Sequence, residues 1–433
     1  MTTTIYRARV LDTPTSPFAG GELRTDEDIA LTVTDGTITA RGPLAEVRAQ
    51  APTAEVIDLR EGILLPGFVD THVHYPQVRA IGGLGMPLLD WLDKCALPEE
   101  EHMADAAYAG QVANEFLAGL VQAGTTSALV FGAHQASAME VFFAAAEQSR
   151  LRITAGLVVG DRLLKDALHT TPASAVEQAE HLIENWHGRG RLRYAVTPRF
   201  SLSATDELLA ACAQTFSSRD DLYFTSHINE NPAEVAAVAE LFPQAAHYLD
   251  TYDRHGLLGP RSILAHDVHP TEPELTRMAQ TGTSVAHCPS SNASLGSGLF
   301  PMRAHLDAGV HLALGSDVGG GTGFSLLKEG LLAYFAQQNR PDGVPLAPEH
   351  LLHLATGAGA QALGLDQVGH LSVGMAFDGV LVRPQDGSTF EVVLRHAASA
   401  GEALAKIFAL GTPADVAGTW VAGERVTGDL IRG

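Results

Sequence analysis

Cysteine is scarce in this 433-residue sequence, which contains only three. Cys95, Cys212 and Cys288 lie far apart in the sequence and form no close pair. This excludes a disulfide framework and a zinc site built from cysteines, and it is typical of proteins from a reducing compartment. Any metal site in this chain must therefore be built from imidazole and carboxylate ligands.

Basic residues are also few, with 28 Lys and Arg against 50 Asp and Glu, which gives a formal net charge of −22. Nucleic acids and anionic membranes both bind basic surfaces, so we expect neither as a partner. No run of 18 apolar residues occurs, and the first residues show no basic segment followed by an apolar one. The sequence therefore predicts a cytoplasmic globular protein with no membrane span and no secretory signal.

Several common catalytic motifs are missing as well. The sequence has no Walker A loop, no G-x-G-x-x-G after a strand, no G-x-S-x-G and no H-E-x-x-H. These absences exclude the usual nucleotide-binding loops, the α/β-hydrolase nucleophile and a common zinc-protease site. What the sequence does contain is histidine, with 19 residues.

Eight short apolar runs, each followed by a segment of helical character, occupy the middle of the chain. Continuous apolar strands that alternate with helices predict a parallel sheet buried on both faces. Eight such units over about 250 residues match a (β/α)8 barrel of the TIM type. The long gap after the first run leaves room for an extra active-site loop or helix around 87–101. The runs are 67–74, 125–131, 151–160, 192–200, 222–227, 262–266, 283–287 and 311–317.

The two chain ends consist of short strands and turns. Apolar runs at 5–11 and 29–33 are strand-like, and Asp35-Gly36 marks a hairpin. After residue 370 we expect further strands at 377–383, 390–394, 420–421 and 424–426. The predicted fold class is α/β, with a barrel of residues 67–370 and a small β-sandwich domain formed by residues 1–66 and 371–433.

Histidine and aspartate stand at the ends of four of the expected barrel strands. His72 and His74 end the first run, His227 the fifth, His266 the sixth and Asp317 the eighth. Barrel active sites lie at the carboxyl ends of the strands, and residues two apart in a strand face the same side. We therefore expect these side chains to meet around one divalent transition metal, zinc before iron, with one position left for a water molecule.

Glu230 follows His227 by three residues, close enough to reach the same metal. A glutamate that is not itself a ligand could move protons there. A glutamate at a helix N-terminus is also stabilised by the helix dipole. Beside a metal ligand we favour the proton-transfer role.

These motifs resemble the amidohydrolase superfamily, and the resemblance covers the whole chain. Its bimetallic members carry a lysine on the fourth strand, whereas residues 197–200 here read Thr-Pro-Arg-Phe. The chain is thus similar to the mononuclear branch, which is rich in deaminases of purines, pterins and triazines. Within that branch, His-Tyr-Pro-Gln at 74–77 and Pro-Arg-Phe at 198–200 resemble the guanine deaminase family.

The resemblance implies hydrolytic deamination of guanine to xanthine and ammonia by a metal-activated water. Glu230 would carry protons to the ring and to the leaving amine, and Asp317 would take the proton of the water. His266 would either ligate the metal weakly or polarise the attacking water. Gln77 and Arg199 would read the purine edge. The implied substrate-binding residues are His74, Gln77, Arg199, Phe200, His227, Glu230 and Asp317, and a homodimer is expected.

Three alternatives differ from this hypothesis. A related aminohydrolase could act on 8-oxoguanine, a pterin or a triazine. A non-enzymatic scaffold of the same superfamily would have no reason to keep Glu230 beside the ligands. A cytidine-deaminase type of site needs a cysteine pair that this sequence lacks. We expect Trp91 to pack a loop outside the site, and His134 and His287 to be structural or supporting residues.

Overall fold

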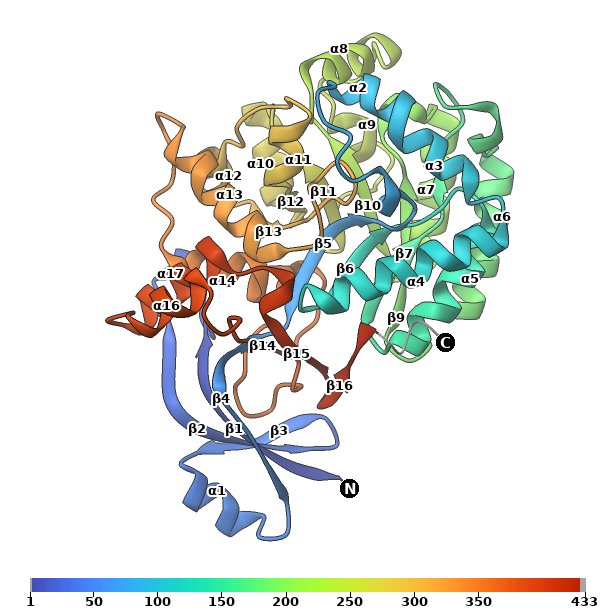
Figure 1. The fold of residues 1–433 in the computed structure, drawn as a ribbon. Coiled ribbons are helices and arrows are strands. Elements are labelled where there is room, and N and C mark those ends of the chain that lie inside the picture. The colour runs from blue at the N-terminus through green and yellow to red at the C-terminus, as the bar shows by residue number, and fades with distance from the viewer. Residues whose placement is uncertain (1, 429–433) are drawn as a thin grey trace.

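The computed structural model describes residues 2–428. A barrel of parallel strands surrounded by helices forms the larger part, and a mixed sheet made from both chain ends lies at one end of it (Figure 1). The expected fold class is confirmed. No helix among the described residues is long and apolar enough to cross a membrane.

Each of the eight expected apolar runs contains a barrel strand, and neighbouring strands pair in parallel in chain order. The third run also holds a short extension, β8 (Val158–Val159), which pairs with one neighbour only. The barrel strands are β5 (Phe68–His74), β6 (Thr125–Phe131), β7 (Arg152–Gly156), β9 (Leu192–Pro198), β10 (Tyr223–Ile228), β11 (Ser262–His266), β12 (Ser284–His287) and β13 (His311–Leu314).

Helices cover the outside of the barrel, and several begin at a residue whose side chain accepts a backbone N–H of the first turn. Asp105, Thr171, Thr205 and Asn231 cap their helices in this way, which satisfies donors that the helix itself leaves unpaired. The main helices are α4 (Ala106–Gln122), α5 (Ala136–Ser149), α6 (Pro172–Trp186), α7 (Asp206–Ser217), α8 (Pro232–Leu241), α10 (Glu272–Thr281), α12 (Met302–Ala308), α13 (Leu326–Gln338), α14 (Pro348–Ala355) and α15 (Gly357–Ala362).

Shorter helical elements extend the loops at the carboxyl ends of the strands. The extra segment expected around 87–101 is helical and lies near α8, at the end of the barrel away from the small sheet (Figure 1). These elements are η2 (Tyr75–Ala80), α2 (Leu88–Trp91), the π-helical η3 (Leu92–Ala96), α3 (Leu97–His102), η4 (Asp166–Leu168), η5 (Ser201–Ser203), α9 (Asp250–Asp253) and α11 (Pro289–Ser294).

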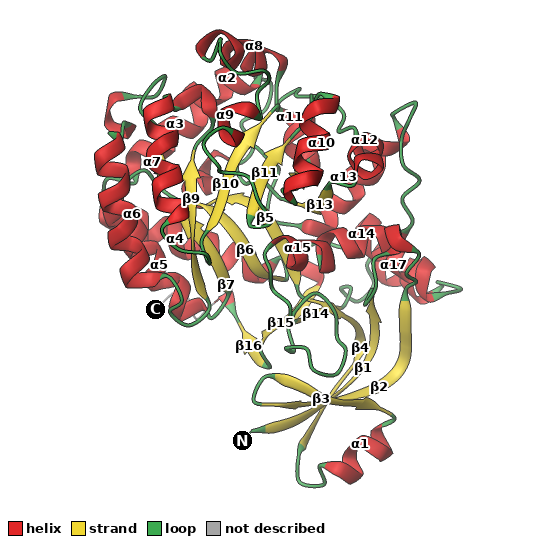
Figure 2. Ribbon diagram, turned by 180° about the vertical axis from the view of Figure 1, so that it is seen from behind, coloured by secondary structure: helices red, strands yellow, loops and turns green. Residues whose placement is uncertain are grey.

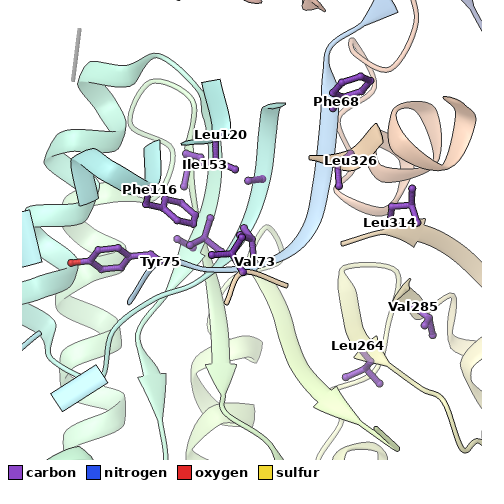
Figure 3. Close-up of a cluster of buried hydrophobic side chains, with 14 of the residues drawn as sticks. Phe68, Val73, Tyr75, Phe116, Leu120, Ile153, Leu264, Val285, Leu314 and Leu326 are labelled. Carbon is purple, nitrogen blue, oxygen red and sulfur yellow. The ribbon is translucent and has the colours of Figure 1, made fainter. Parts of the chain in front are cut away.

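Barrel strands send alternate side chains to two different apolar clusters. Val285 and Leu264 belong to the large cluster that includes the helices, whereas Ala286 and Ala265, one residue further on, belong to a second cluster. Figure 3 shows Val73 and Tyr75 near Phe116 of α4 in the large cluster. Because successive side chains of a strand point to opposite faces, this alternation shows which positions face the helices and which face the barrel interior.

The two chain ends form one mixed sheet in the order β16-β15-β14-β4-β1-β2-β3. The pairing of β1 with both neighbours is interrupted near Ala8, and the sheet bends there. Tyr6 from one side of the bend stacks on Phe377, with ring centroids 4.4 Å apart. The part of the chain expected to be a β-sandwich is thus one mixed sheet with an apolar cluster of its own. Its strands are β1 (Thr3–Asp12), β2 (Arg24–Thr34), β3 (Thr37–Gly42), β4 (Glu55–Pro66), β14 (Gly379–Val382), β15 (Val416–Val421) and β16 (Glu424–Val426).

One expected strand is wrong: residues 390–394 lie in helix α16 (Thr389–Arg395). The apolar run Phe390–Leu394 suggested a strand, but the Ser388 hydroxyl accepts the backbone N–H of Glu391 and starts a helix instead. The following helix α17 (Ala400–Leu410) packs against α14, as Figure 2 shows from behind. The remaining helical elements of the chain ends are η1 (Pro17–Ala19), α1 (Leu44–Gln50) and η6 (Pro413–Asp415). The domain boundaries at residues 66 and 371 stay a prediction.

Candidate metal and substrate site

His72 and His74 project from β5 into the barrel interior. Val73 between them lies in the helix-facing cluster, so the alternation of the strand turns both imidazoles the other way. Their Nε2 atoms are 3.2 Å apart, and both rings are buried. The expectation that this pair faces one point is confirmed.

His227 reaches the same point from β10, with its Nε2 3.2 Å from that of His74. Its Nδ1 lies 2.5 Å from the carbonyl oxygen of Arg199, so Nδ1–H donates to that carbonyl. The hydrogen bond leaves the Nε2 lone pair free to point into the barrel. His227 is therefore held in the tautomer that a metal ligand needs.

His266 arrives at the site by a different route. It pairs with Ile228, which belongs to the helix-facing cluster, and strict alternation would put His266 on that face as well. Its φ of +76° breaks the strand conformation and brings the ring inward. Its Nδ1 lies 3.0 Å from the Asn292 side-chain oxygen, and its Nε2 lies 3.8 Å from Asp317 Oδ2.

Asp317 follows β13 and completes the cluster. Its Oδ1 is 3.1 Å from His72 Nε2 and 3.2 Å from His74 Nε2. Ligand atoms of His72, His74, His227 and Asp317 all lie within 4.8 Å of one another. Three imidazole nitrogens and one carboxylate oxygen converging in a buried site fit a divalent transition metal.

His266 lies outside that set of four and belongs to a second group with His72 and Cys288. Whether it ligates the metal or acts on the water stays a prediction.

The ionisable side chains at this centre differ in their pKa shifts because their surroundings differ. Burial lowers the pKa of His72 to about 3, so the ring is neutral. Burial would raise the pKa of Asp317, but hydrogen bonds with His72 and His74 outweigh it and hold that pKa well below its usual value. Burial, together with the nearby Asp317 charge, raises the pKa of Glu230 to about 8. Two carboxyl groups in one site thus differ in protonation at neutral pH, which is the arrangement that acid and base roles require.

Glu230 is held in place by polar contacts on both sides. Its Oε2 lies 3.6 Å from His266 Nε2, and the Ser297 hydroxyl donates to its Oε1 at 3.1 Å. The backbone N–H of Glu230 donates to Glu234 at the start of α8, at 2.9 Å. Glu234 also accepts the hydroxyl of Tyr248, so the carboxylate that fixes the Glu230 backbone is itself fixed.

Arg199 and Gln77 lie on the other side of the same pocket. Both are buried, and both donate to Glu100 of α3: Arg199 Nη1 at 2.6 Å and Gln77 Nε2 at 2.8 Å. Phe200 follows Arg199, and its ring centroid is 6.0 Å from that of His227. All the residues expected to contact substrate line one pocket.

Apolar residues cover this pocket from the extra segment after β5. Leu88, Trp91 and Leu92 line it together with Leu295. Trp91 was expected to pack a loop outside the site; it does pack against Leu88 and Leu295, and it also forms part of the wall. The sequence signal that could have placed it there is its position in the insertion expected to cover the strand ends.

Glu100 is the functional candidate that the sequence analysis missed. Three consecutive glutamates at 99–101 read as a solvated helix face, and nothing in the sequence distinguishes the middle one. His134 contacts it as well, with Nε2 3.1 Å from Glu100 Oε2, and thus supports the site as expected. His287, in contrast, makes no side-chain hydrogen bond within the described residues and stacks on Phe300, consistent with a structural role.

Comparisons with known proteins agree with this geometry. The amidohydrolase family model matches residues 63–426. A protein of Deinococcus radiodurans named probable guanine deaminase is 60% identical over 97% of both chains. The solved structure of E. coli guanine deaminase is 34% identical, has a TM-score of 0.93, and covers 98% of this chain and 99% of its own. A guanine deaminase from C. acetobutylicum, solved with guanine in its active site, is 25% identical with a TM-score of 0.91, over 98% and 100%.

A match of this extent, on a barrel whose strand ends carry the histidines and aspartate described above, leads to one assignment: the chain belongs to the amidohydrolase family.

Proposed function

We propose that this chain hydrolyses guanine to xanthine and ammonia. The observation that carries the proposal is one pocket in which a buried His and Asp centre faces a buried arginine and glutamine. The relatives described above support the choice of guanine among the ring amines that such a pocket could accept.

His72, His74, His227 and Asp317 would hold the metal. When bound there, a divalent transition metal lowers the pKa of a water molecule so that it can attack near neutral pH. Imidazole and carboxylate ligands suit zinc, and iron is the alternative. The ionised Asp317 is placed to accept the proton of the attacking water.

Glu230 supplies the acid of the reaction. Burial favours its protonated form, so it can give a proton to the purine N3 as the water oxygen bonds to C2. The proton that Asp317 has taken then moves to the amino nitrogen through Glu230. The C2–N bond breaks, ammonia leaves, and the added oxygen gives its remaining proton back to Glu230 and stays as the new carbonyl. His266 orients the attacking water from the side of Glu230 and Asp317.

Arg199 and Gln77 read the edge of the purine away from the reacting amine. An arginine has only donors, so it matches the C6 carbonyl and N7 of guanine. Adenine carries an amino group at C6 and would leave donors facing donors. Phe200 lies beside Arg199 and can contact the ring face, and Gln77 can both donate and accept.

A panel of bases tests the proposal. Guanine, adenine, 8-oxoguanine, a pterin and an amino-triazine are assayed by ultraviolet absorbance, with metal content measured on the same preparation. We expect guanine to give the highest kcat/KM and xanthine and ammonia to form in equal amounts. Guanine as the poorest of the panel would overturn the proposal, and a chain that neither contains a metal nor gains activity with one would favour a scaffold.

We further propose zinc as the resident metal, a cytoplasmic location and a homodimer. All three cysteines are free, which fits a reducing compartment. The homodimer rests on the family resemblance alone. Light scattering on the purified protein tests it, and a monomer at micromolar concentration would exclude it.

A further inference from the structure

One buried carboxylate joins three elements of the pocket. Glu100 lies on α3 and is 2% exposed. Its oxygens contact Arg199 after β9, Gln77 on η2 and His134 after β6. No other described carboxylate contacts either Arg199 or Gln77.

These contacts fix the orientation of the two groups that would read the substrate. Arg199 uses a single nitrogen, Nη1, for both Glu100 oxygens, at 2.6 and 2.9 Å. Its Nε and Nη2 donors therefore remain for a ligand. Gln77 gives Nε2 to Glu100 and accepts the backbone N–H of Gly319 on Oε1 at 3.2 Å, so its amide cannot turn over without losing both contacts.

Glu100 also sets the charge on this side of the pocket. Burial would raise the pKa of Glu100, but the Arg199 guanidinium outweighs it and holds that pKa well below its usual value. The carboxylate and the guanidinium cancel in a place where an isolated buried charge would be costly. The side of the pocket formed by Arg199 and Gln77 thus offers oriented hydrogen-bond donors but carries no net charge.

We propose that Glu100 is a positioning residue. It aligns Arg199 and Gln77 for contact with the purine edge, and it keeps this side of the pocket without net charge. This rests on the proposed function. A side of the pocket without net charge suits neutral guanine. It does not strengthen binding of the product xanthine, which loses a proton more readily than guanine and can become an anion. Removal of the carboxylate charge would leave a buried arginine that attracts an anionic ligand.

The test compares Glu100→Gln with its neighbour Glu101→Gln. Glu101 forms a partly exposed pair with Lys165, so its substitution removes the same charge one residue away from the site. For Glu100→Gln we expect a KM for guanine at least tenfold higher, a kcat within about threefold, unchanged metal content, and stronger inhibition by xanthine relative to KM. Glu101→Gln should match the wild type in all four.

A second pair of variants guards against misfolding. Arg199→Gln and the double variant Glu100→Gln/Arg199→Gln complete a cycle, and the double variant leaves no buried charge unpaired. If Glu100 acts through Arg199, the second substitution adds less than threefold to the KM of Arg199→Gln. A KM of Glu100→Gln within twofold of wild type, or fully additive effects in the cycle, would overturn the proposal.

The wild type measured alongside separates the two claims. If it does not deaminate guanine, the proposed function fails. The same comparison of KM is then made on the base that the wild type does turn over.

Discussion

The backbone N–H of Asp317 donates to the carbonyl oxygen of His72, at 2.8 Å. Next to it, the N–H of His74 donates to the carbonyl of Val318, at 2.9 Å. These bonds join the segment that follows β13 to β5, and three of the expected metal ligands, His72, His74 and Asp317, lie at this seam. The contact that closes the barrel therefore also brings His72 and His74 of the first strand next to Asp317.

Removal of the metal should lower the thermal stability of the protein. The ligands converge only in the folded chain, so a bound metal stabilises the native state by about 2.7 kcal/mol at a free concentration 100 times its Kd. We expect dialysis against a chelator to lower Tm by a few degrees and zinc to restore it. Scanning calorimetry on both forms checks this, and an identical Tm would contradict a metal held by the seam residues.

Glu230→Gln should abolish most turnover while leaving binding intact. The amide keeps the size of the side chain and can still accept from Ser297, but it cannot transfer a proton. General acid–base groups contribute about 10²- to 10⁴-fold to rate, and we expect a loss of kcat in this range. Metal content and guanine affinity, measured by calorimetry, serve as the control. Turnover within threefold of wild type would remove Glu230 from the proton pathway.

Arg199→Ala should impair both recognition and stability. It removes the donors for the purine edge, so KM for guanine rises and the preference for guanine over adenine shrinks. It also leaves Glu100 buried without its cation, which costs about 3 kcal/mol or more in free energy of unfolding. Steady-state kinetics and urea unfolding measure the two effects separately. An unchanged KM would exclude Arg199 from the site.

A buried carboxyl on α13 should make stability depend on pH. Burial raises the pKa of Glu329 to about 8, from 4.5 in the unfolded chain. Below pH 4.5 both states are protonated. Between pH 4.5 and about pH 8 only the unfolded state loses the proton. The free energy of unfolding therefore falls by up to about 1.4 kcal/mol per pH unit as the pH rises.

Glu329→Gln tests this relation, because the amide mimics the neutral acid and can still accept the Ser290 N–H, as Glu329 does at 2.9 Å. We expect the Tm of the variant to exceed that of the wild type by a margin that widens from pH 6 to pH 8. The exposed Glu240 on α8 is a matched control whose substitution by Gln should give no such trend. A margin independent of pH would contradict the raised pKa.

The barrel strands were readable from the sequence because a strand buried on both faces must be apolar throughout. The position of the ligands followed from the rule that barrel sites lie at the carboxyl ends. The sequence predicted that His266 lies at the site, but not why. Its ring points inward only because its backbone is in the left-handed region. The residue type alone does not indicate such a departure from strand geometry.

Other features depend on contacts between distant segments. Glu100 lies 99 residues from Arg199 in the chain, and its two glutamate neighbours look the same in the sequence. Helix α16 was misread because the local cap at Ser388 outweighs a run of residues that favour strands. The association of the two chain ends was predictable in outline, but their arrangement as one mixed sheet was not, because it depends on hydrogen bonds between distant strands.

The sheet shared by both chain ends constrains the order in which the protein can be completed during synthesis. Strand β4 leads directly into the first barrel strand, yet its partner β14 begins only at Gly379, after the whole barrel. Until then the apolar segment Ile63–Leu65 has an unpaired edge, a known route to aggregation. Strand β14, which is made after the whole barrel, is thus the strand that covers this edge of β4.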